Sequence, residues 1–460
     1  MGRDRTLILL LGFAFMLAGC GGVSPSSGSG GSGGTAANGG SSGSGGAGGS
    51  AATGGIGGAG GELGTPALDP LPSAPSYAVV SSDFSSTSIA MLDEEFEVLD
   101  ESWLNSGTTY PGLVATLSGD VVLPTRQQGN GTFSVVDRFL TDVVTQFFVP
   151  SGNLNGQLRT QGDTGDSGFS SNPQDVIFVD ENSAWIPRYE SNLDPGAAPE
   201  NQGNDLIEIN PADWSPTGRR FDLSSFNTLE TVDGASVETF ARPGRGVRLG
   251  STILLGLDRI SASFDAAGPG ALAVIDTEDE SILSIELEGL ESCGRVVPVP
   301  GSPSKAAIAC VGFSNPFGDE SQIRASAGIL MVDAAPGGVT VEHLWKVSAE
   351  ESSAIAVHGL VALDDRRVLA VANGNFVDTT DVLYEVDLSN GMQSEVLTSE
   401  GSFTIGVAAY DAEAGMLYVP DASANAVIEL VEDAGGFREV DSTEIAPGLG
   451  LPPTQVYRLD

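Results

Sequence analysis

Histidine, cysteine and basic side chains are scarce in this chain of 460 residues. It has 2 His, 3 Cys, and 20 Lys and Arg against 61 Asp and Glu, so its formal net charge is −41 at pH 7. So few histidines and cysteines exclude a multi-histidine metal centre, a zinc ribbon and an iron–sulfur cluster. Nucleic acid needs clustered cations on its partner, and we therefore expect no nucleic-acid partner for so acidic a chain.

The first twenty residues have the organisation of an export signal. Two arginines precede an apolar stretch over residues 7–17, which is too short for the roughly 20 residues that span a bilayer. The stretch leads into Leu17-Ala18-Gly19-Cys20, which resembles the lipobox of bacterial lipoproteins. This resemblance implies that residues 1–19 are a signal peptide and that Cys20 is lipidated. The alternative is an ordinary cleaved signal with a chance cysteine.

A segment of very low complexity follows the cysteine. Residues 21–65 contain 21 glycines in 45 positions and have no charged residue before Glu62. Such a composition has almost no apolar surface to bury, and ordering so many glycines is costly in entropy. We expect residues 20–75 to be a lipidated cysteine with a disordered tether, and residues 76–460 to form the folded domain. The protein would then be held at a bacterial cell envelope by its lipid, at the outer membrane or cell surface rather than the inner membrane.

Short apolar runs separated by Gly, Asp, Asn, Ser and Pro dominate the rest of the chain, and no helical period extends over twelve residues. A strand pattern that ends in Asp or Asn recurs, as in Phe133–Asp137, Leu206–Asn210 and Leu272–Asp276. An Asp at a strand end favours a turn, so we interpret these residues as structural. Because the units repeat every 40–70 residues as four strands each, the sequence predicts an all-β, seven-bladed β-propeller of antiparallel blades. A loop-rich β-sandwich is the alternative.

The two ends of this domain complement each other. Residues 454–460 have the pattern of an innermost strand with no partner after it, and residues 77–83 have that of a second strand with none before it. We expect the C-terminal strand to pair with the N-terminal one and close the ring.

Two segments also resemble a known family. Residues 415–431 (GMLYVPDASANAVIELV) resemble the YVTN-type repeat of bacterial surface and periplasmic β-propellers, and residues 358–374 (HGLVALDDRRVLAVANG) resemble the matching hairpin of that family and of NHL-like propellers. The resemblance implies the propeller fold. It implies little about activity, because such propellers include both binding proteins and enzymes.

A cysteine pair allows a local prediction. Cys293 and Cys310 flank two short strands around a turn near residues 300–303, and residues equally distant from that turn should face each other. Cys293 then lies opposite Cys310, and an exported protein meets an oxidising compartment, so we predict a disulfide between them.

Loops that precede innermost strands, and loops between second and third strands, should meet on one face of a propeller. The candidate ligand face comprises Asp175, Arg188, Tyr189, Arg245, Arg295, His358, Asn373 and Asn375. Converging arginines would suit a carboxylate, a sugar acid or a phosphate. The alternative is that they pair with neighbouring Asp between blades. His358 is a candidate general base or metal ligand, although histidines at such positions more often bond a loop carbonyl.

Two oxygen-rich loops, residues 163–168 and 375–381, are candidates for Ca²⁺, but neither has the spacing of an EF-hand. We expect no cofactor and assign no confident metal ligand or catalytic residue. The interpretation that the sequence favours is a monomeric, non-catalytic binding or scaffold module for an envelope protein or glycan. The alternative is a lactonase or sugar-acid hydrolase that uses the central face of the propeller, with or without a divalent metal.

Overall fold

The computed structural model describes residues 68–110, 113–161, 169–315, 319–335, 338–347, 357–374 and 379–459. The predicted signal peptide, Cys20 and most of the predicted tether therefore lie outside the described residues, as do Asn375, the side chain of His358 and the loop of residues 163–168. In the part of the chain that is described, no helix is long and apolar enough to cross a membrane.

Almost all of the secondary structure is antiparallel β-sheet. Seven sheets have four strands each and an eighth has three. We number the four-stranded sheets 1 to 7 in chain order. The first strands of consecutive sheets contact one another (β14 with β19, β19 with β23, β27 with β31), so these strands lie innermost.

The strands run from the innermost to the outermost in each sheet. Sheet 1 consists of β31 (Pro453–Arg458), β1 (Tyr77–Ser82), β2 (Thr87–Leu92) and β3 (Val98–Asn105). Sheet 2 consists of β4 (Val121–Val122), β5 (Thr132–Asp137), β6 (Val143–Phe148) and β7 (Leu154–Arg159), and sheet 3 of β8 (Ile177–Phe178), β9 (Ala184–Ser191), β10 (Gly203–Asn210) and β11 (Ser215–Asp222). Sheet 4 consists of β14 (Pro243–Leu249), β15 (Thr252–Leu257), β17 (Ala271–Asp276) and β18 (Ile282–Glu286).

The remaining sheets follow the same order. Sheet 5 consists of β19 (Arg295–Pro298), β20 (Lys305–Val311), β21 (Ala327–Asp333) and β22 (Thr340–Lys346). Sheet 6 consists of β23 (Val357–Ala362), β24 (Arg367–Ala372), β25 (Val382–Asp387) and β26 (Met392–Thr398), and sheet 7 of β27 (Ala409–Asp411), β28 (Met416–Asp421), β29 (Ala426–Asp433) and β30 (Gly436–Glu444).

The hydrophobic core is divided among the gaps between neighbouring sheets. One cluster of buried side chains joins each sheet to the next along the chain, and one joins sheet 7 back to sheet 1. The last cluster includes Tyr77 and Val79 of β1, Val427 of β29 and Val456 of β31. The sheets therefore pack face to face around a closed ring, which is the arrangement of a β-propeller.

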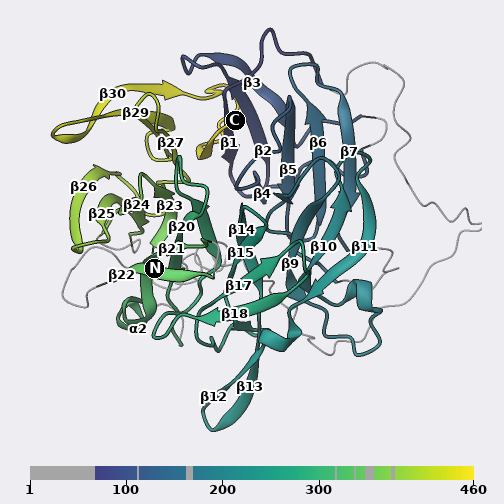
Figure 1. Ribbon diagram of the computed structural model, residues 1–460. Helices are drawn as coiled ribbons and strands as arrows, with labels where there is room; N and C mark the ends of the chain where they lie inside the picture. The colour runs from purple at the N-terminus through teal and green to yellow at the C-terminus, as the bar shows by residue number, and fades with distance from the viewer. Residues whose placement is uncertain are drawn as a thin grey trace, which may run out of the picture.

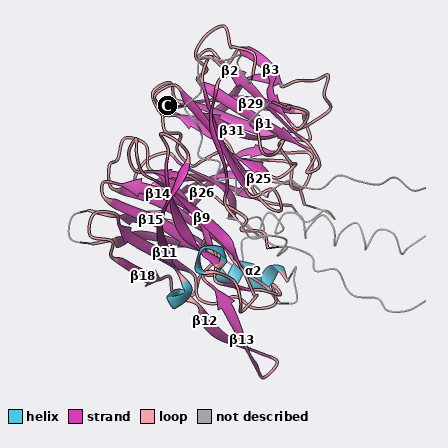
Figure 2. Cartoon of the chain, turned by 90° about the vertical axis from the view of Figure 1, so that its right-hand side faces the viewer, coloured by secondary structure: helices cyan, strands magenta, loops and turns pink. Residues whose placement is uncertain are grey.

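The C-terminal strand completes the first sheet, as predicted. In β31, Tyr457 is paired with Ala78 and Arg458 with Tyr77 of β1, in an antiparallel ladder. Figure 1 shows the C-terminus beside β1, and Figure 2 shows β31 next to β1. This pairing covers the inner edge of β1, which would otherwise leave its N–H and C=O groups unpaired.

The strand assignments within the repeats are right for most blades and wrong for sheet 2. The motif strands that end at Asn210, Asp276 and Asp387 are third strands, and the side chain of each accepts a backbone N–H two residues on, at 2.8–3.0 Å. The copy that ends at Asp137 is β5, a second strand. Its carboxylate instead accepts hydrogen bonds from the N–H and hydroxyl of Ser118, at 2.7 and 2.5 Å.

The folded domain begins earlier than the predicted boundary at residue 76. Leu68 and Leu71 are 7% and 6% exposed and pack in the cluster between sheets 1 and 2. Their amides donate to the carbonyls of Gly152 and Pro150 at 3.1 and 2.8 Å. These two leucines anchor residues 68–75 to the folded domain.

Two insertions depart from the repeated unit. The three-stranded sheet consists of β12 (Thr228–Val232), β13 (Ala235–Phe240) and β16 (Ile260–Ser261), and its hairpin projects from the ring in Figures 1 and 2. Helix α2 (Glu320–Ser326) lies between β20 and β21, and its N-cap Asp319 accepts the N–H groups of Ser321 and Gln322. Two short 3₁₀ turns, Pro199–Asn201 and Ser224–Phe226, complete the described helices.

Candidate functional site

The innermost strands begin at one end of the ring, which we call the leading end. Backbone contacts connect the starts of these strands from sheet to sheet. The N–H of Arg245 donates to the carbonyl of Gly294 at 2.7 Å, and Val407 forms a parallel bridge with Gln455. Residues that precede or open the innermost strands are therefore brought together, as the sequence predicts for Asp175, Arg245 and Arg295.

Two arginines from adjacent strands lie side by side at the leading end. Arg245 is in β14, and Arg295 is the first residue of β19. Their backbones approach so closely that a Cβ on Gly244 would lie 2.1 Å from the carbonyl oxygen of Gly294, so only glycine fits there. Both arginines are half-buried. Burial, and next the positive charge of Arg245, lower the pKa of Arg295 to about 10.

Neither arginine has a carboxylate partner among the described residues. No ion pair within 4.0 Å involves Arg245 or Arg295 in the described ranges, although 18 such contacts connect other side chains. The Nε of Arg295 is buried without a hydrogen-bond partner. Two adjacent guanidinium groups without an ion-paired carboxylate among the described residues favour the binding of an anion.

The charge of Asp175 acts on both arginines, but its oxygens already accept other hydrogen bonds. It is fully buried and accepts hydrogen bonds from the N–H and hydroxyl of Thr125, at 2.9 and 2.6 Å, and from the N–H of Gly246 at 3.2 Å. Burial raises the pKa of Asp175, whereas the charge of Arg245 and these donors lower it. Asp175 therefore holds the start of β14 in place and is not exposed to act as a base.

The closing strand β31 supplies neutral polar groups to the same place. The guanidinium carbon of Arg245 is 6.0 Å from the centre of the Tyr457 ring, at the outer limit of a cation–π contact. The hydroxyl of Tyr457 donates to Oε1 of Gln455 at 3.0 Å, and Nε2 of Gln455 donates to the carbonyl of Val121 at 2.8 Å. We call Arg245, Arg295, Tyr457 and Gln455 the arginine site.

Tyr457 was not among the residues predicted from the sequence for the ligand face. The signal that would have found it is the alternation of side chains along β31: Tyr457 is two positions after Gln455, with only Val456 between them, so both project to the same face of the strand.

Arg188 and Tyr189 are not part of this site, although the sequence predicted them there. Arg188 is 1% exposed and makes a bidentate ion pair with Asp205 at 2.7 and 2.6 Å. Its remaining nitrogen donates to the carbonyl of Thr160 at 2.9 Å. Tyr189 is fully buried, and its hydroxyl donates to Asp258 at 3.0 Å. Arg188 thus pairs with an Asp of its own sheet, whereas the alternative weighed for the arginines was pairing between blades.

The remaining predicted residues are on sheet 6. His358 is paired with Val371 within the β23–β24 ladder, and Asn373, which is 7% exposed, directly follows β24. Asp381 ends the second candidate Ca²⁺ loop, but its carboxylate accepts N–H groups of Gly374 and of residues 403–405. Within the described ranges, no group of three or more His, Cys, Asp and Glu side chains is placed to hold a metal ion.

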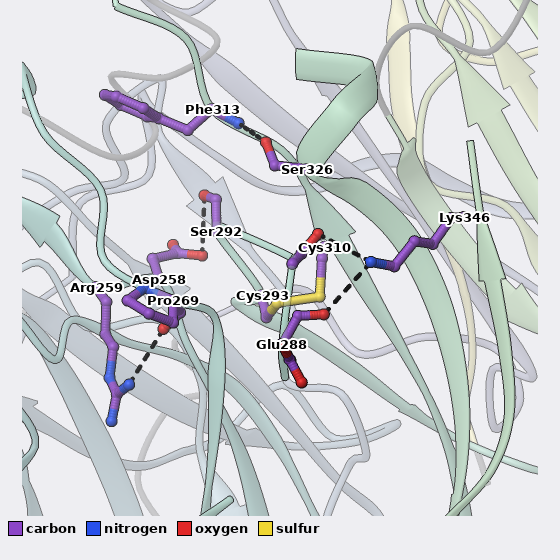
Figure 3. The surroundings of a disulfide bond; sticks show 11 residues. Asp258, Arg259, Pro269, Glu288, Ser292, Cys293, Cys310, Phe313, Ser326 and Lys346 are labelled. Carbon is purple, nitrogen blue, oxygen red and sulfur yellow. Dashed lines mark hydrogen bonds between the residues drawn. A yellow bond between two sulfur atoms is a disulfide. The ribbon is translucent and has the colours of Figure 1, made fainter. Parts of the chain in front are cut away.

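The predicted disulfide is confirmed. Cys293 and Cys310 are bonded with an S–S distance of 2.04 Å, and both are fully buried (Figure 3). The ladder of β19 with β20 is one residue out of the predicted register, because Arg295 pairs with Ala309. Beyond the end of this ladder the pairing shifts back to the predicted register, because the N–H of Val311 donates to the carbonyl of Ser292. The sulfurs therefore face each other across the end of this hairpin.

Comparison with known proteins shows the fold. No protein-family model matches the chain, and no curated protein matches it in sequence. Among solved structures, a Bacteroides fragilis protein provisionally described as a 6-phosphogluconolactonase is similar over 85% of this chain and 99% of its own, with 11% identity and a TM-score of 0.52. The periplasmic gluconolactonase of Pseudomonas aeruginosa is similar over 84% and 99%, with 12% identity and a TM-score of 0.50.

These similarities correct the function that the sequence favoured. A non-catalytic binding or scaffold module was expected because histidines are few and the loops are irregular. The similar structures are instead described as lactone-hydrolysing enzymes. At such low identity they share the fold with this chain and no more.

Proposed function

We propose that the protein is a lactonase-type hydrolase that acts on a sugar-acid lactone at the arginine site. The observation that carries the proposal is the pair of guanidinium groups, Arg245 and Arg295, that have no carboxylate partner among the described residues. The descriptions of the two similar structures support the class of substrate.

The chemistry of lactone hydrolysis suits a pair of cations. Water adds to the carbonyl carbon, negative charge develops on the carbonyl oxygen, and the ring C–O bond then breaks to give a hydroxy acid. Donors fixed in place before the reaction stabilise that oxyanion best, because they need not reorganise. Arg245 and Arg295 would donate to the oxyanion and afterwards to the product carboxylate. Tyr457 and Gln455 would bind the sugar hydroxyls.

The test is hydrolysis of D-glucono-1,5-lactone followed by pH-stat titration. The variants are Arg295→Met and Arg295→Lys, with Arg438→Met as the matched control, because the Arg438 side chain is 63% exposed on the outermost strand β30. Loss of one oxyanion donor is expected to lower kcat/KM by about 10²–10³-fold. Lysine keeps the charge without the planar fork, so it should restore only part of the activity. Equal activity of wild type, Arg295→Met and Arg438→Met would contradict the proposal.

We also propose that the enzyme is exported and anchored to the cell envelope through lipidated Cys20. The lipobox-like motif and the low-complexity segment after it support the anchor. Mass spectrometry of the mature N-terminus tests it: a Cys20 that carries acyl chains is expected, and a Cys20→Ser chain should be released from membranes. Recovery of both chains in the soluble fraction would contradict anchoring.

A further inference from the structure

The segment just before Arg295 is fixed by a buried carboxylate from the neighbouring sheet. Asp258 directly follows β15 and is 6% exposed. It accepts a hydrogen bond from the hydroxyl of Ser292 at 3.2 Å. A Cβ on Gly294 would lie 2.7 Å from each carboxylate oxygen, so glycine is required for this approach. Figure 3 shows Asp258 and Ser292 joined beside the disulfide.

Tyr189 holds that carboxylate from the other side. Its hydroxyl donates to Oδ2 of Asp258 at 3.0 Å, and the guanidinium of Arg242 lies 5.0 Å from the centre of its ring. Arg242 is in turn ion-paired with Glu190 at 3.0 Å. Asp258 therefore cannot shift without breaking contacts that extend into sheet 3. Charged hydrogen-bond partners of this kind are the stronger class of hydrogen bond in proteins.

The residues before Arg295 are thus restrained one after another. Ser292 donates to Asp258, Cys293 is bonded to Cys310, Asp258 packs directly against Gly294, and the carbonyl of Gly294 accepts the N–H of Arg245. Within the described ranges the Nε of Arg295 is buried without a hydrogen-bond partner, and no ion pair holds its side chain. Its position at the leading end is consequently set by the backbone that precedes it.

We propose that Asp258, held by Tyr189, is the positioning residue that sets Arg295 for anion binding at the arginine site. The proposal rests on the function proposed above, in that the anion is the sugar-acid product or the oxyanion that leads to it. Asp258 does not touch the substrate. It acts through the Ser292–Gly294 backbone, which places the guanidinium of Arg295 next to that of Arg245.

The experiment measures D-gluconate binding by isothermal titration calorimetry for the wild type, Tyr189→Phe and Ser292→Ala, with Tyr77→Phe as the control. Tyr77 is a close match, because it is 1% exposed and its hydroxyl also donates to a carboxylate, Asp411, at 3.0 Å. Loss of a hydrogen bond to a charged group is expected to raise the Kd about tenfold in Tyr189→Phe. Tyr77→Phe should keep the wild-type Kd, although we expect both Tyr77→Phe and Tyr189→Phe to unfold at a lower temperature than the wild type.

Lactone kinetics supply the second readout. Tyr189→Phe and Ser292→Ala should raise KM and lower kcat together, whereas a merely structural defect would lower only the fraction of active protein. Wild-type gluconate affinity in both variants, alongside lost binding in Arg295→Met, would overturn the positioning role. A wild type that binds gluconate through Arg295 but does not hydrolyse lactones would refute the proposed reaction and leave the positioning role intact.

Discussion

Closure of the ring by β31 makes a quantitative prediction for Val456. This side chain is 1% exposed in the cluster that joins sheets 7 and 1. Val456→Ala removes two methyl groups at about 0.8 kcal/mol each, and the cavity that remains adds a further penalty, so we expect a loss of about 2 kcal/mol of unfolding free energy. That loss is a substantial part of the 5–15 kcal/mol that is typical of folded domains.

Urea unfolding followed by tryptophan fluorescence measures this loss, with Val440→Ala as the control. Val440 is in the outermost strand β30 and is 46% exposed, so its truncation should cost less than about 0.5 kcal/mol. Deleting residues 454–460 should abolish the cooperative transition, because the inner edge of the fully buried strand β1 then has no partner. Equal, small losses in both valine variants, or a cooperative transition in the deletion, would refute closure by β31.

Three further predictions concern buried groups. Labelling of the folded protein should detect no free thiol at Cys293 or Cys310, and replacing both by Ala should lower stability by about 3 kcal/mol for a loop of this length; a labelled thiol would contradict the bond. Asp205→Asn should lower the free energy of unfolding by about 3–5 kcal/mol, because buried Arg188 loses its charged partner. The KM for lactone should be unchanged in the folded protein, and an altered KM would indicate that Arg188 takes part in substrate binding. Burial raises the pKa of Asp137 to about 6 from 3.8, so the folded protein favours the protonated carboxyl. The free energy of unfolding is therefore highest below pH 4, and about 3 kcal/mol of it is lost as the pH rises through 6. The stability difference between wild type and Asp137→Asn, followed in urea from pH 4 to 7, should fall accordingly, and a flat difference would refute this assignment.

The fold was largely predictable because its signals are local. Short apolar runs predict the strands, Asp residues at their ends predict the turns, and the patterns at the two chain ends predict that these ends pair. The disulfide follows from counting residues outward from one turn. Sheet 2 was misassigned for the same reason. Phe133–Asp137 has the local pattern of a third strand, but it is the second strand of its sheet, and Asp137 accepts hydrogen bonds from Ser118, which precedes β4.

The site was less predictable because it depends on partners distant in sequence. Arg188, Arg245 and Arg295 look alike as isolated arginines beside strands. Only the fold shows that Arg188 has Asp205 beside it, whereas the other two have each other. Tyr457 enters the site because the ring closes, which places the end of the chain against Arg245.

The most direct test of the account is the initial rate of D-glucono-1,5-lactone hydrolysis by the wild type and by the double variant Arg245→Met/Arg295→Met, with Arg438→Met as the control. The account predicts turnover above the uncatalysed rate for the wild type and the control, and none for the double variant. It also predicts that all three proteins share one far-ultraviolet circular dichroism spectrum. Turnover that survives removal of both arginines, in a folded protein, would contradict the central claim that these two side chains form the active site.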